Sequence, residues 1–246
     1  MNKHDEEVAA RVKSNRDNSS LNTSARAFMQ ASIRSKYSYN FTWLGRPIIQ
    51  YPQDMIAMQE ILWLVQPDLV VETGIAHGGS LIFSAAMLEL NAACGGPKSA
   101  EVLGLDIDIR AHNREAIEAH PMAKRISMIE GSSIASDVIE QVKAKAATKH
   151  RVLVSLDSNH THDHVLAELE AYSPLVSVGS YCVVFDTIIE DLPEDTSIER
   201  PWGRGNNPKT ATREFLRTHP EFEADRLIDN KISVSVASEG YLRRVR

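Results

Sequence analysis

Acidic and imidazole side chains gather where two apolar segments of the chain end. Asp157 closes one segment in VLVSLDSNH, His160 follows three positions later, and Asp186 closes the next segment in YCVVFDT. Two carboxylates at the tips of adjacent parallel strands repel each other unless a cation or a shared proton lies between them. A divalent ion such as Mg²⁺ takes oxygen ligands and leaves positions open for a substrate hydroxyl. Asp157 and Asp186 are therefore predicted to bind Mg²⁺, with water or Asn159 completing the shell.

The histidine that follows Asp157 can act as a general base. His160 is predicted to lie beside the metal, where an imidazole that titrates near neutrality can take a proton from a substrate alcohol. His160 and Asp157 are the two predicted catalytic residues. Zinc held by His160, His162 and His164 is the competing interpretation, although their spacing matches neither H-E-x-x-H nor a hydrolase-type motif. Ligand type favours magnesium, and His162 and His164 are expected to be solvated or to cap a helix.

A glycine-rich turn interrupts an apolar segment in the stretch VVETGIAHGGS. Small residues let the backbone turn sharply and approach a ligand, and the N–H groups of the following helix point toward it. The turn is neither G-x-G-x-x-G nor a phosphate-binding loop, because no lysine follows its second glycine. An acidic residue before the turn fits a cationic ligand without phosphates, such as S-adenosylmethionine. The predicted cofactor-binding residues here are Glu72, Thr73, Gly74, Ala76, Gly79 and Ser80.

Other strand ends complete the predicted cofactor site. Asp106 ends the segment LGLD, where its carboxylate can accept both hydroxyls of a ribose. The alternative is that Asp106 or Asp108 only caps the next helix. Ser132 and Ser133 follow the next strand. Their position at the end of that strand is the reason for predicting that they border the adenine of the cofactor. Asp157 is also included among the predicted cofactor contacts.

Alternating apolar and amphipathic segments predict the elements that must position these residues. They indicate an α/β fold with a mostly parallel sheet and helices on both faces. In such sheets ligands bind at the carboxyl ends of the strands, where the residues above lie. The expected strands are Leu69–Thr73, Val102–Ile107, Ile126–Ile129, Val152–Asp157 and Ser180–Asp186, and the expected helices are Pro52–Val65, Ser80–Leu90, Asn113–His120, Ile134–Thr148 and Asp163–Tyr172.

The two ends of the chain have different patterns. Residues 1–35 are predicted to form a polar extension with a short helix at Ala25–Ile33, and residues 36–246 to form one domain. At the other end, Arg226–Asp229, Ile232–Ala237 and Gly240–Val245 are β-rich. They are expected to return an antiparallel strand to the sheet.

Two loops are predicted to shape an acceptor pocket. Residues 201–208 are too rich in glycine and proline for an element interior, and their Trp202 and Asn206 suit the face and hydroxyls of a sugar. Packing of Trp202 on the core or on a neighbouring subunit is the alternative. Residues 37–52, with Trp43, Arg46 and Gln50, are expected to form a lid over the cofactor or a subunit contact. Tyr37 and Trp43 of this segment are also predicted acceptor contacts.

Composition excludes several classes of protein. The chain has 246 residues, a net charge of −6 and a pI near 5.9, which argues against a dedicated nucleic-acid binder. Its apolar runs are too short for a membrane span, and its start has no signal-peptide core, so a cytoplasmic protein is expected. Cys94 and Cys182 fit that compartment as free thiols.

Long stretches of the sequence resemble a known family. YSYNFTWLGRPIIQYPQDM, LDSNHTHDHVLAELEAYSPLVSVGSYCVVFDT and RPWGRGNNPKTATREFL are similar to the cephalosporin hydroxylase or rhamnosyl O-methyltransferase family. The resemblance runs from about Tyr37 to the end of the chain. It implies a Rossmann-like class I methyltransferase domain that binds S-adenosylmethionine, uses Mg²⁺ and forms homo-oligomers.

The resemblance also implies roles for individual residues. A related macrolide-sugar methyltransferase pattern has metal-binding acids at the position of Asp157 and in an acidic pair after the next strand, and its base matches His160. Here Phe185 stands before Asp186, so one carboxylate of that pair is missing.

The expected function follows from these residues and from the resemblance. It is transfer of a methyl group to a hydroxyl of a sugar-containing acceptor, which is a glycolipid, a polysaccharide or a glycosylated natural product. The alternatives are a hydroxylase or oxygenase, with iron on His160, His162 and Asp157 or Asp163, and a cofactor-binding module without catalysis. The chain has no nicotinamide fingerprint, and Phe185 is the sequence hint for lost catalysis.

Overall fold

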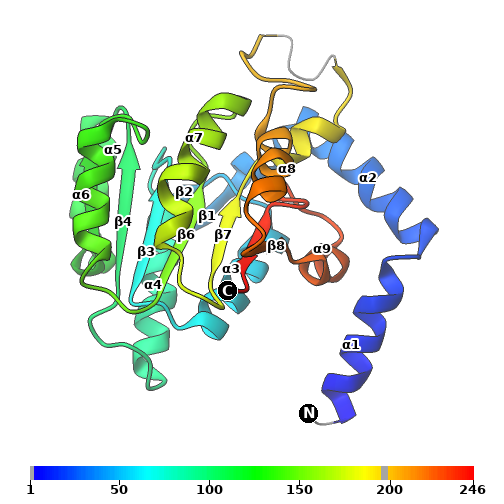
Figure 1. Ribbon diagram of the computed structural model, residues 1–246, viewed down its shortest axis with the longest axis horizontal. Helices are drawn as coiled ribbons and strands as arrows, with labels where there is room; N and C mark the ends of the chain where they lie inside the picture. The colour runs from blue at the N-terminus through cyan, green and yellow to red at the C-terminus, as the bar shows by residue number, and fades with distance from the viewer. Residues whose placement is uncertain (1–2, 195–198) are drawn as a thin grey trace.

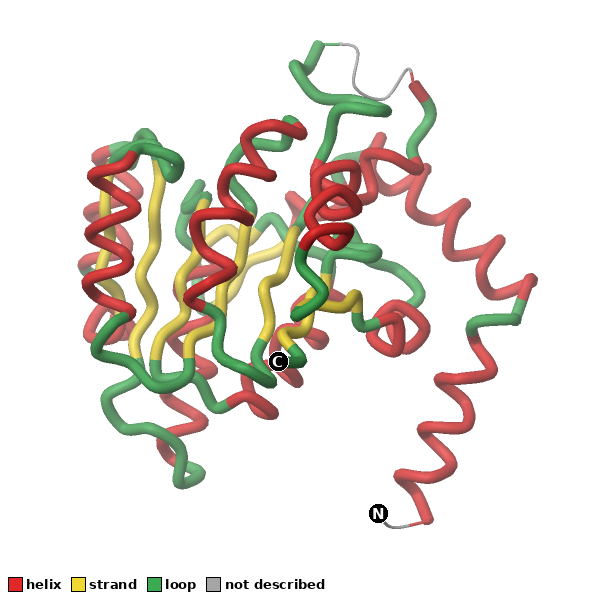
Figure 2. The backbone as a smooth tube through the Cα atoms, in the orientation of Figure 1, coloured by secondary structure: helices red, strands yellow, loops and turns green. Residues whose placement is uncertain are grey.

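A twisted seven-stranded sheet forms the centre of the molecule in the computed structural model, which describes residues 3–194 and 199–246. The strand order is β5-β4-β3-β6-β7-β9-β8 (Figures 1 and 2). Five strands are parallel, and β9 runs antiparallel to both β7 and β8. The predicted α/β fold with a mostly parallel sheet is confirmed. The strands are β3 (Leu69–Thr73), β4 (Glu101–Asp106), β5 (Ile126–Glu130), β6 (Val152–Leu156), β7 (Tyr181–Val184), β8 (Phe222–Ala224) and β9 (Tyr241–Arg244).

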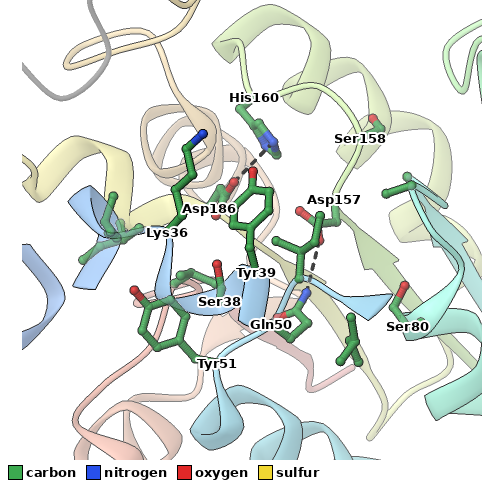
Figure 3. Close-up of a pocket in the computed structure, with 18 of the residues that line it drawn as sticks. Lys36, Ser38, Tyr39, Gln50, Tyr51, Ser80, Asp157, Ser158, His160 and Asp186 are labelled. Atoms are coloured by element: carbon green, nitrogen blue, oxygen red, sulfur yellow. Dashed lines mark hydrogen bonds and ion pairs between the residues drawn. The ribbon is translucent and has the colours of Figure 1, made fainter. Parts of the chain in front are cut away.

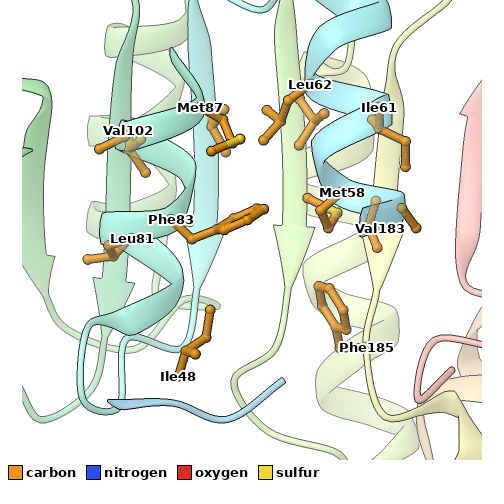
Figure 4. Packing of buried hydrophobic residues seen from close by; sticks show 14 of the residues in the cluster. Ile48, Met58, Ile61, Leu62, Leu81, Phe83, Met87, Val102, Val183 and Phe185 are labelled. Carbon is orange, nitrogen blue, oxygen red and sulfur yellow. The ribbon is translucent and has the colours of Figure 1, made fainter. Parts of the chain in front are cut away.

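Helices cover both faces of the sheet, because the central strands are apolar on both sides. In β6, Val152 and Val154 pack in one core cluster while Leu153 packs in the other. The first cluster lies under α6 (Ser136–Ala146), α7 (His162–Tyr172) and α8 (Pro208–Thr218). The second lies under α3 (Pro52–Val65), α4 (Gly79–Ala93) and α5 (Ala111–Glu118), where Met58, Phe83 and Phe185 pack together (Figure 4).

Strand register brings the predicted site residues to one edge of the sheet. Thr73 pairs with Leu105 on one side and with Leu156 on the other. The residues that follow these three strand ends therefore lie side by side. From β3 the strand order continues through β4 and β5 on one side and through β6 and β7 on the other. In doubly wound sheets, ligands bind at the carboxyl ends of the strands where the order reverses in this way.

The N-terminal segment contains more helix than the sequence predicted. α1 (Lys3–Asn15) buries no residue, while α2 (Ser19–Arg34) contains the predicted short helix and buries Met29 and Ser32. The chain continues through η1 (Tyr37–Asn40) into a hairpin of β1 (Phe41–Trp43) and β2 (Arg46–Ile48). The other 3-10 turns are η2 (Pro121–Arg125), η3 (Ser173–Leu175) and η4 (Thr187–Asp191).

Part of the C-terminal prediction was wrong. Residues 226–229 are not a strand, because they begin α9 (Arg226–Ile232), which Asp225 caps by accepting a hydrogen bond from Leu227 N. Residues 233–237 form a loop, because Asp54 on α3 binds Ser235 Oγ at 2.5 Å and Val236 N at 3.0 Å. The segment predicted at 240–245 does contain β9. Among the described residues, no helix has both the length and the apolar character needed to cross a membrane.

Candidate functional site

A cavity of about 480 Å³ opens at the carboxyl ends of the central strands. Asp157 directly after β6, His160 in the following loop and Asp186 after β7 all line it (Figure 3). One ligand atom from each of the three lies within 4.8 Å of those of the other two. The distance between His160 Nε2 and Asp186 Oδ2 is 3.2 Å. The structure thus brings together the three residues that the sequence predicted to be neighbours.

The Asp157 carboxylate stands in a strongly acidic environment. Burial raises its pKa well above the usual value, and the nearby Asp186 and Glu72 raise that pKa further. Gln50 Nε2 donates a hydrogen bond to Asp157 Oδ2 at 3.2 Å, while the buried Gln50 Oε1 has no hydrogen-bond partner among the described residues. In that part of the chain, no lysine or arginine forms an ion pair with Asp157 or Asp186. A bound cation would satisfy this cluster.

His160 in the loop and His162 and His164 at the start of α7 have different partners. His162 Nδ1 lies 2.8 Å from Thr210 Oγ1 on α8, and His164 Nε2 lies 3.1 Å from Ser133 Oγ. Neither histidine lines the cavity. In the described residues, the zinc set of three histidines and the iron set of two histidines are therefore not assembled. The metal-binding group that forms there has one imidazole and two carboxylates.

Phe185 and Asp186 differ in direction because β7 ends between them. Phe185 is 4% exposed and lies in the same core cluster as Val183, two positions earlier. Asp186 adopts the left-handed conformation with φ 55°, which aspartate tolerates better than most residues. The apolar side chain therefore packs beneath the site, and the turn brings the one remaining carboxylate of the expected pair toward His160.

The glycine turn packs against the backbone of two neighbouring segments. A Cβ on Gly74 would lie 2.0 Å from the Asp157 carbonyl oxygen, and a Cβ on Gly79 would lie 2.1 Å from the Pro47 carbonyl oxygen. Gly78 occupies the N-cap of α4, and no described side chain accepts a hydrogen bond there from the first N–H groups of this helix. Gly74, Ala76, Gly79 and Ser80 all line that cavity.

Glu72 lies behind the turn rather than on the main cavity. It is 3% exposed and accepts hydrogen bonds from Ser80 Oγ and Ser84 Oγ. Burial raises its pKa to about 7, against the opposing effect of the two hydroxyl donors. Thr73 is buried as well and supports Asp157 N through its carbonyl oxygen at 2.9 Å.

The predicted ribose and adenine contacts lie on the β4 and β5 side of the turn, outside the main cavity. Asp106 Oδ2 accepts hydrogen bonds from Ile75 N at 2.8 Å and Ala76 N at 3.2 Å, and its Oδ1 accepts one from Asp108 N. Asp106 therefore holds the glycine turn in its present shape. Ser133 is buried against His164, and Ser132 accepts a backbone bond from Ala135.

Three further predicted contacts are Trp202 and Asn206 for the acceptor and Asn159 for the metal. Of these, Trp202 lines the cavity. Its ring meets that of His160 edge to face with centroids 4.8 Å apart. Asn206 instead joins its loop to α7 by accepting a hydrogen bond from His162 N. Asn159 Oδ1 accepts hydrogen bonds from Thr161 N and Thr161 Oγ1, so the loop already uses this oxygen.

The predicted lid, residues 37–52, lies over the glycine turn, but its two predicted acceptor contacts, Tyr37 and Trp43, pack inward. Trp43 meets Phe83 at 4.9 Å in the core, and Tyr37 packs among other aromatic rings. Arg46 Nε holds the hairpin to the His77 carbonyl oxygen at 3.0 Å. Neither Tyr37 nor Trp43 lines the cavity. Gln50, which the sequence analysis placed in the lid, does line the cavity. The sequence predictions did not name these lining residues: Lys36, Tyr39, Ser158 and Arg200.

Replacing Gly74 with alanine is expected to lower the free energy of unfolding by roughly 3 kcal/mol or more, because strain at φ 90° adds to the backbone clash. Gly95→Ala is the matched control, since Gly95 has φ 96° and nothing within 4 Å of an added Cβ. That control should cost roughly 1 kcal/mol. Urea unfolding curves measure both changes, and equal losses would show that the close approach to Asp157 is unimportant.

Comparisons with known proteins show which family the chain belongs to. The family described as "Rhamnosyl O-methyltransferase/CmcI" matches residues 35–245. A rhamnosyl O-methyltransferase of Mycobacterium leprae (strain TN) is 31% identical over 207 residues, covering 82% of this chain and 82% of that protein. The rhamnosyl O-methyltransferase of Mycobacterium tuberculosis (strain ATCC 25618 / H37Rv) is 31% identical over 208 residues, covering 82% of this chain and 78% of that protein.

Solved structures share the fold at lower sequence identity. The apo structure of CmcI has a TM-score of 0.58 and 21% identity, covering 85% of this chain and 77% of that chain. A CmcI structure described as containing Mg and SAM has a TM-score of 0.58 and 20% identity, with coverage of 85% and 78%. An O-methyltransferase from Bacillus cereus in complex with SAH has a TM-score of 0.51 and 15% identity, with coverage of 81% and 81%.

Proposed function

The chain belongs to the rhamnosyl O-methyltransferase/CmcI family, and from this we propose that it methylates a hydroxyl of a sugar-containing acceptor with Mg²⁺ assistance. It is an S-adenosylmethionine-dependent O-methyltransferase. The observation that carries the proposal is the group of Asp157, His160 and Asp186 on a cavity beside the glycine turn. The acceptor is proposed to be a glycolipid, a polysaccharide or a glycosylated natural product.

The residues present fit both bound groups. Asp157 and Asp186 would hold Mg²⁺, since no lysine or arginine of the described chain forms an ion pair with either carboxylate. Gly74, Ala76, Gly79 and Ser80 would lie along S-adenosylmethionine, because they line the cavity and the start of α4 offers free N–H groups. When bound, the ion lowers the pKa of the acceptor hydroxyl and the cofactor supplies an electrophilic methyl group.

The chain's own residues would position the reactants and move the proton. His160 is proposed to accept the proton of the acceptor hydroxyl, in an imidazole whose Nε2 lies 3.2 Å from Asp186 Oδ2 and whose ring meets the edge of Trp202. Gln50 would fix the direction of the Asp157 carboxylate through its hydrogen bond. Holding the hydroxyl in line with the methyl group supplies much of the rate enhancement.

Removal of divalent ions is expected to abolish methyl transfer. Protein treated with excess EDTA should transfer no labelled methyl group from S-adenosylmethionine to a panel of sugars, and added Mg²⁺ should restore transfer. Calorimetry should also show Mg²⁺ binding in the absence of any acceptor, which separates metal binding from turnover. Transfer that continues after chelation would contradict the metal assignment, and absence of cofactor binding would contradict the function itself.

A further inference from the structure

Two basic side chains line the cavity without an acidic partner among the described residues. Lys36 comes from the junction of α2 and η1, and Arg200 lies two positions before Trp202. Apart from the contact between Arg200 and the Trp202 ring, neither side chain forms an ion pair or hydrogen bond within residues 3–194 and 199–246. A cation at the wall of a concave site, without a carboxylate beside it, is available to a ligand.

The positions of both cations are defined by their neighbours. Lys36 adopts the left-handed conformation with φ 54°, and its backbone N donates to the Ile33 carbonyl oxygen at 3.0 Å. Figure 3 shows the Lys36 side chain pointing toward His160, on the other side of Asp157 from Ser80. The Arg200 guanidinium lies 5.3 Å from the centre of the Trp202 ring, which itself contacts His160. Both cations therefore lie on the proposed acceptor side.

The balance of charge indicates what these cations bind. The only acidic residues among the cavity's described lining are Asp157 and Asp186, and a divalent ion between them would cancel their charge. Lys36 and Arg200 would then remain beside a cofactor that is itself cationic. An acceptor with an anionic group would restore the balance, and a guanidinium fork matches the oxygen geometry of carboxylates and phosphates.

We propose that the acceptor sugar carries an oxyanion, a carboxylate or a phosphate, which Lys36 and Arg200 bind while a neighbouring hydroxyl faces His160. The inference rests on the proposed methyl transfer and names the chemical class of its acceptor. The acidic sugar would be recognised by the two cations and by the ring of Trp202, which lies beside Arg200.

Direct binding tests this inference without turnover. Three probes of the same sugar are titrated into protein loaded with Mg²⁺ and S-adenosylhomocysteine: methyl glucoside, methyl glucuronoside and glucose 1-phosphate. The two anionic probes are expected to bind about tenfold more tightly than the neutral one, because charge-assisted hydrogen bonds are stronger than neutral ones. The tighter of the two anionic probes distinguishes a carboxylate from a phosphate.

Substitutions assign the effect to these two side chains. Lys36→Gln and Arg200→Gln are each expected to weaken anionic probes about fivefold and to leave the neutral probe unchanged. Lys98→Gln and Arg26→Gln are matched controls, since both residues are exposed and lie outside the cavity. Salt should weaken anionic binding alone.

Equal affinity for all three probes, or equal weakening of all three in the variants, would overturn the inference. Cofactor binding is measured in a separate titration of the same protein. Failure there would contradict the proposed methyl transfer, whereas the probes report on the anion site independently.

Discussion

Replacing Asp157 with asparagine is expected to stabilise the metal-free protein while lowering methyl transfer about a thousandfold, since a metal clamp contributes several kcal/mol. The asparagine keeps the size of the side chain and its hydrogen-bond acceptor for Gln50. It removes one of two neighbouring carboxylates that no lysine or arginine of the described chain pairs with. Loss of repulsion explains the gain in stability, and loss of a metal ligand explains the loss of activity.

The stability gain should depend on pH in a defined direction. Burial and Asp186 raise the folded-state pKa of Asp157 above the value of about 3.9 in the unfolded chain. The folded protein therefore loses stability as the pH rises above the unfolded value, and the full loss is reached beyond the folded value. Asp157→Asn removes this loss, so its advantage should be absent near pH 4 and should grow toward pH 8.

Thermal unfolding with and without Mg²⁺ measures these effects. Mg²⁺ should raise the melting temperature of the natural protein and have much less effect on the variant, because ligand binding to the folded state stabilises it. Asp17→Asn, at an exposed turn far along the chain from the site, provides the control and should behave like the natural protein. A variant that is less stable at pH 8 and still responds to Mg²⁺ would refute the proposed charge crowding.

The sequence predicted the sheet and the metal-binding group for the same physical reason. Buried parallel strands are continuous apolar runs, so their ends are visible where the first polar residue appears. Asp106, Asp157 and Asp186 each mark such an end. Parallel strands end at one edge, so the proximity of Asp157 and Asp186 followed from their positions in the chain.

Contacts between distant segments could not be predicted in this way. The β-branched residues between 232 and 237 have strand composition, yet Asp54 on α3 binds this segment as a loop. Trp43 and Tyr37 are residue types that suit a sugar-binding lid. They pack instead against aromatic rings of the neighbouring helices, Phe83 on α4 and Phe28 on α2. Lys36 and Gln50 reach the cavity through backbone turns that leave no periodic pattern in the sequence.

Replacing His160 with alanine is expected to lower methyl transfer by roughly 10² to 10⁴-fold, the usual contribution of a general base. Cofactor affinity should not change, because the imidazole lies on the side of Asp186 and Trp202 rather than on the glycine turn. Added imidazole should restore part of the activity by filling the space that the side chain leaves. Rates of methyl transfer, measured with and without imidazole, test both statements.

The control for this variant lies two positions further along the chain, at the first residue of α7. His162 has a similar side-chain exposure of 21%, against 15% for His160, but it binds Thr210 and Glu214 on α8. His162→Ala should therefore reduce stability more than it reduces the rate of transfer.

Magnesium affinity then decides between two roles for His160, because its imidazole lies within 4.8 Å of both carboxylates and could itself hold the ion. Unchanged Mg²⁺ affinity in His160→Ala would support the base. Strongly reduced affinity would show instead that His160 occupies the ligand position that Phe185 cannot fill.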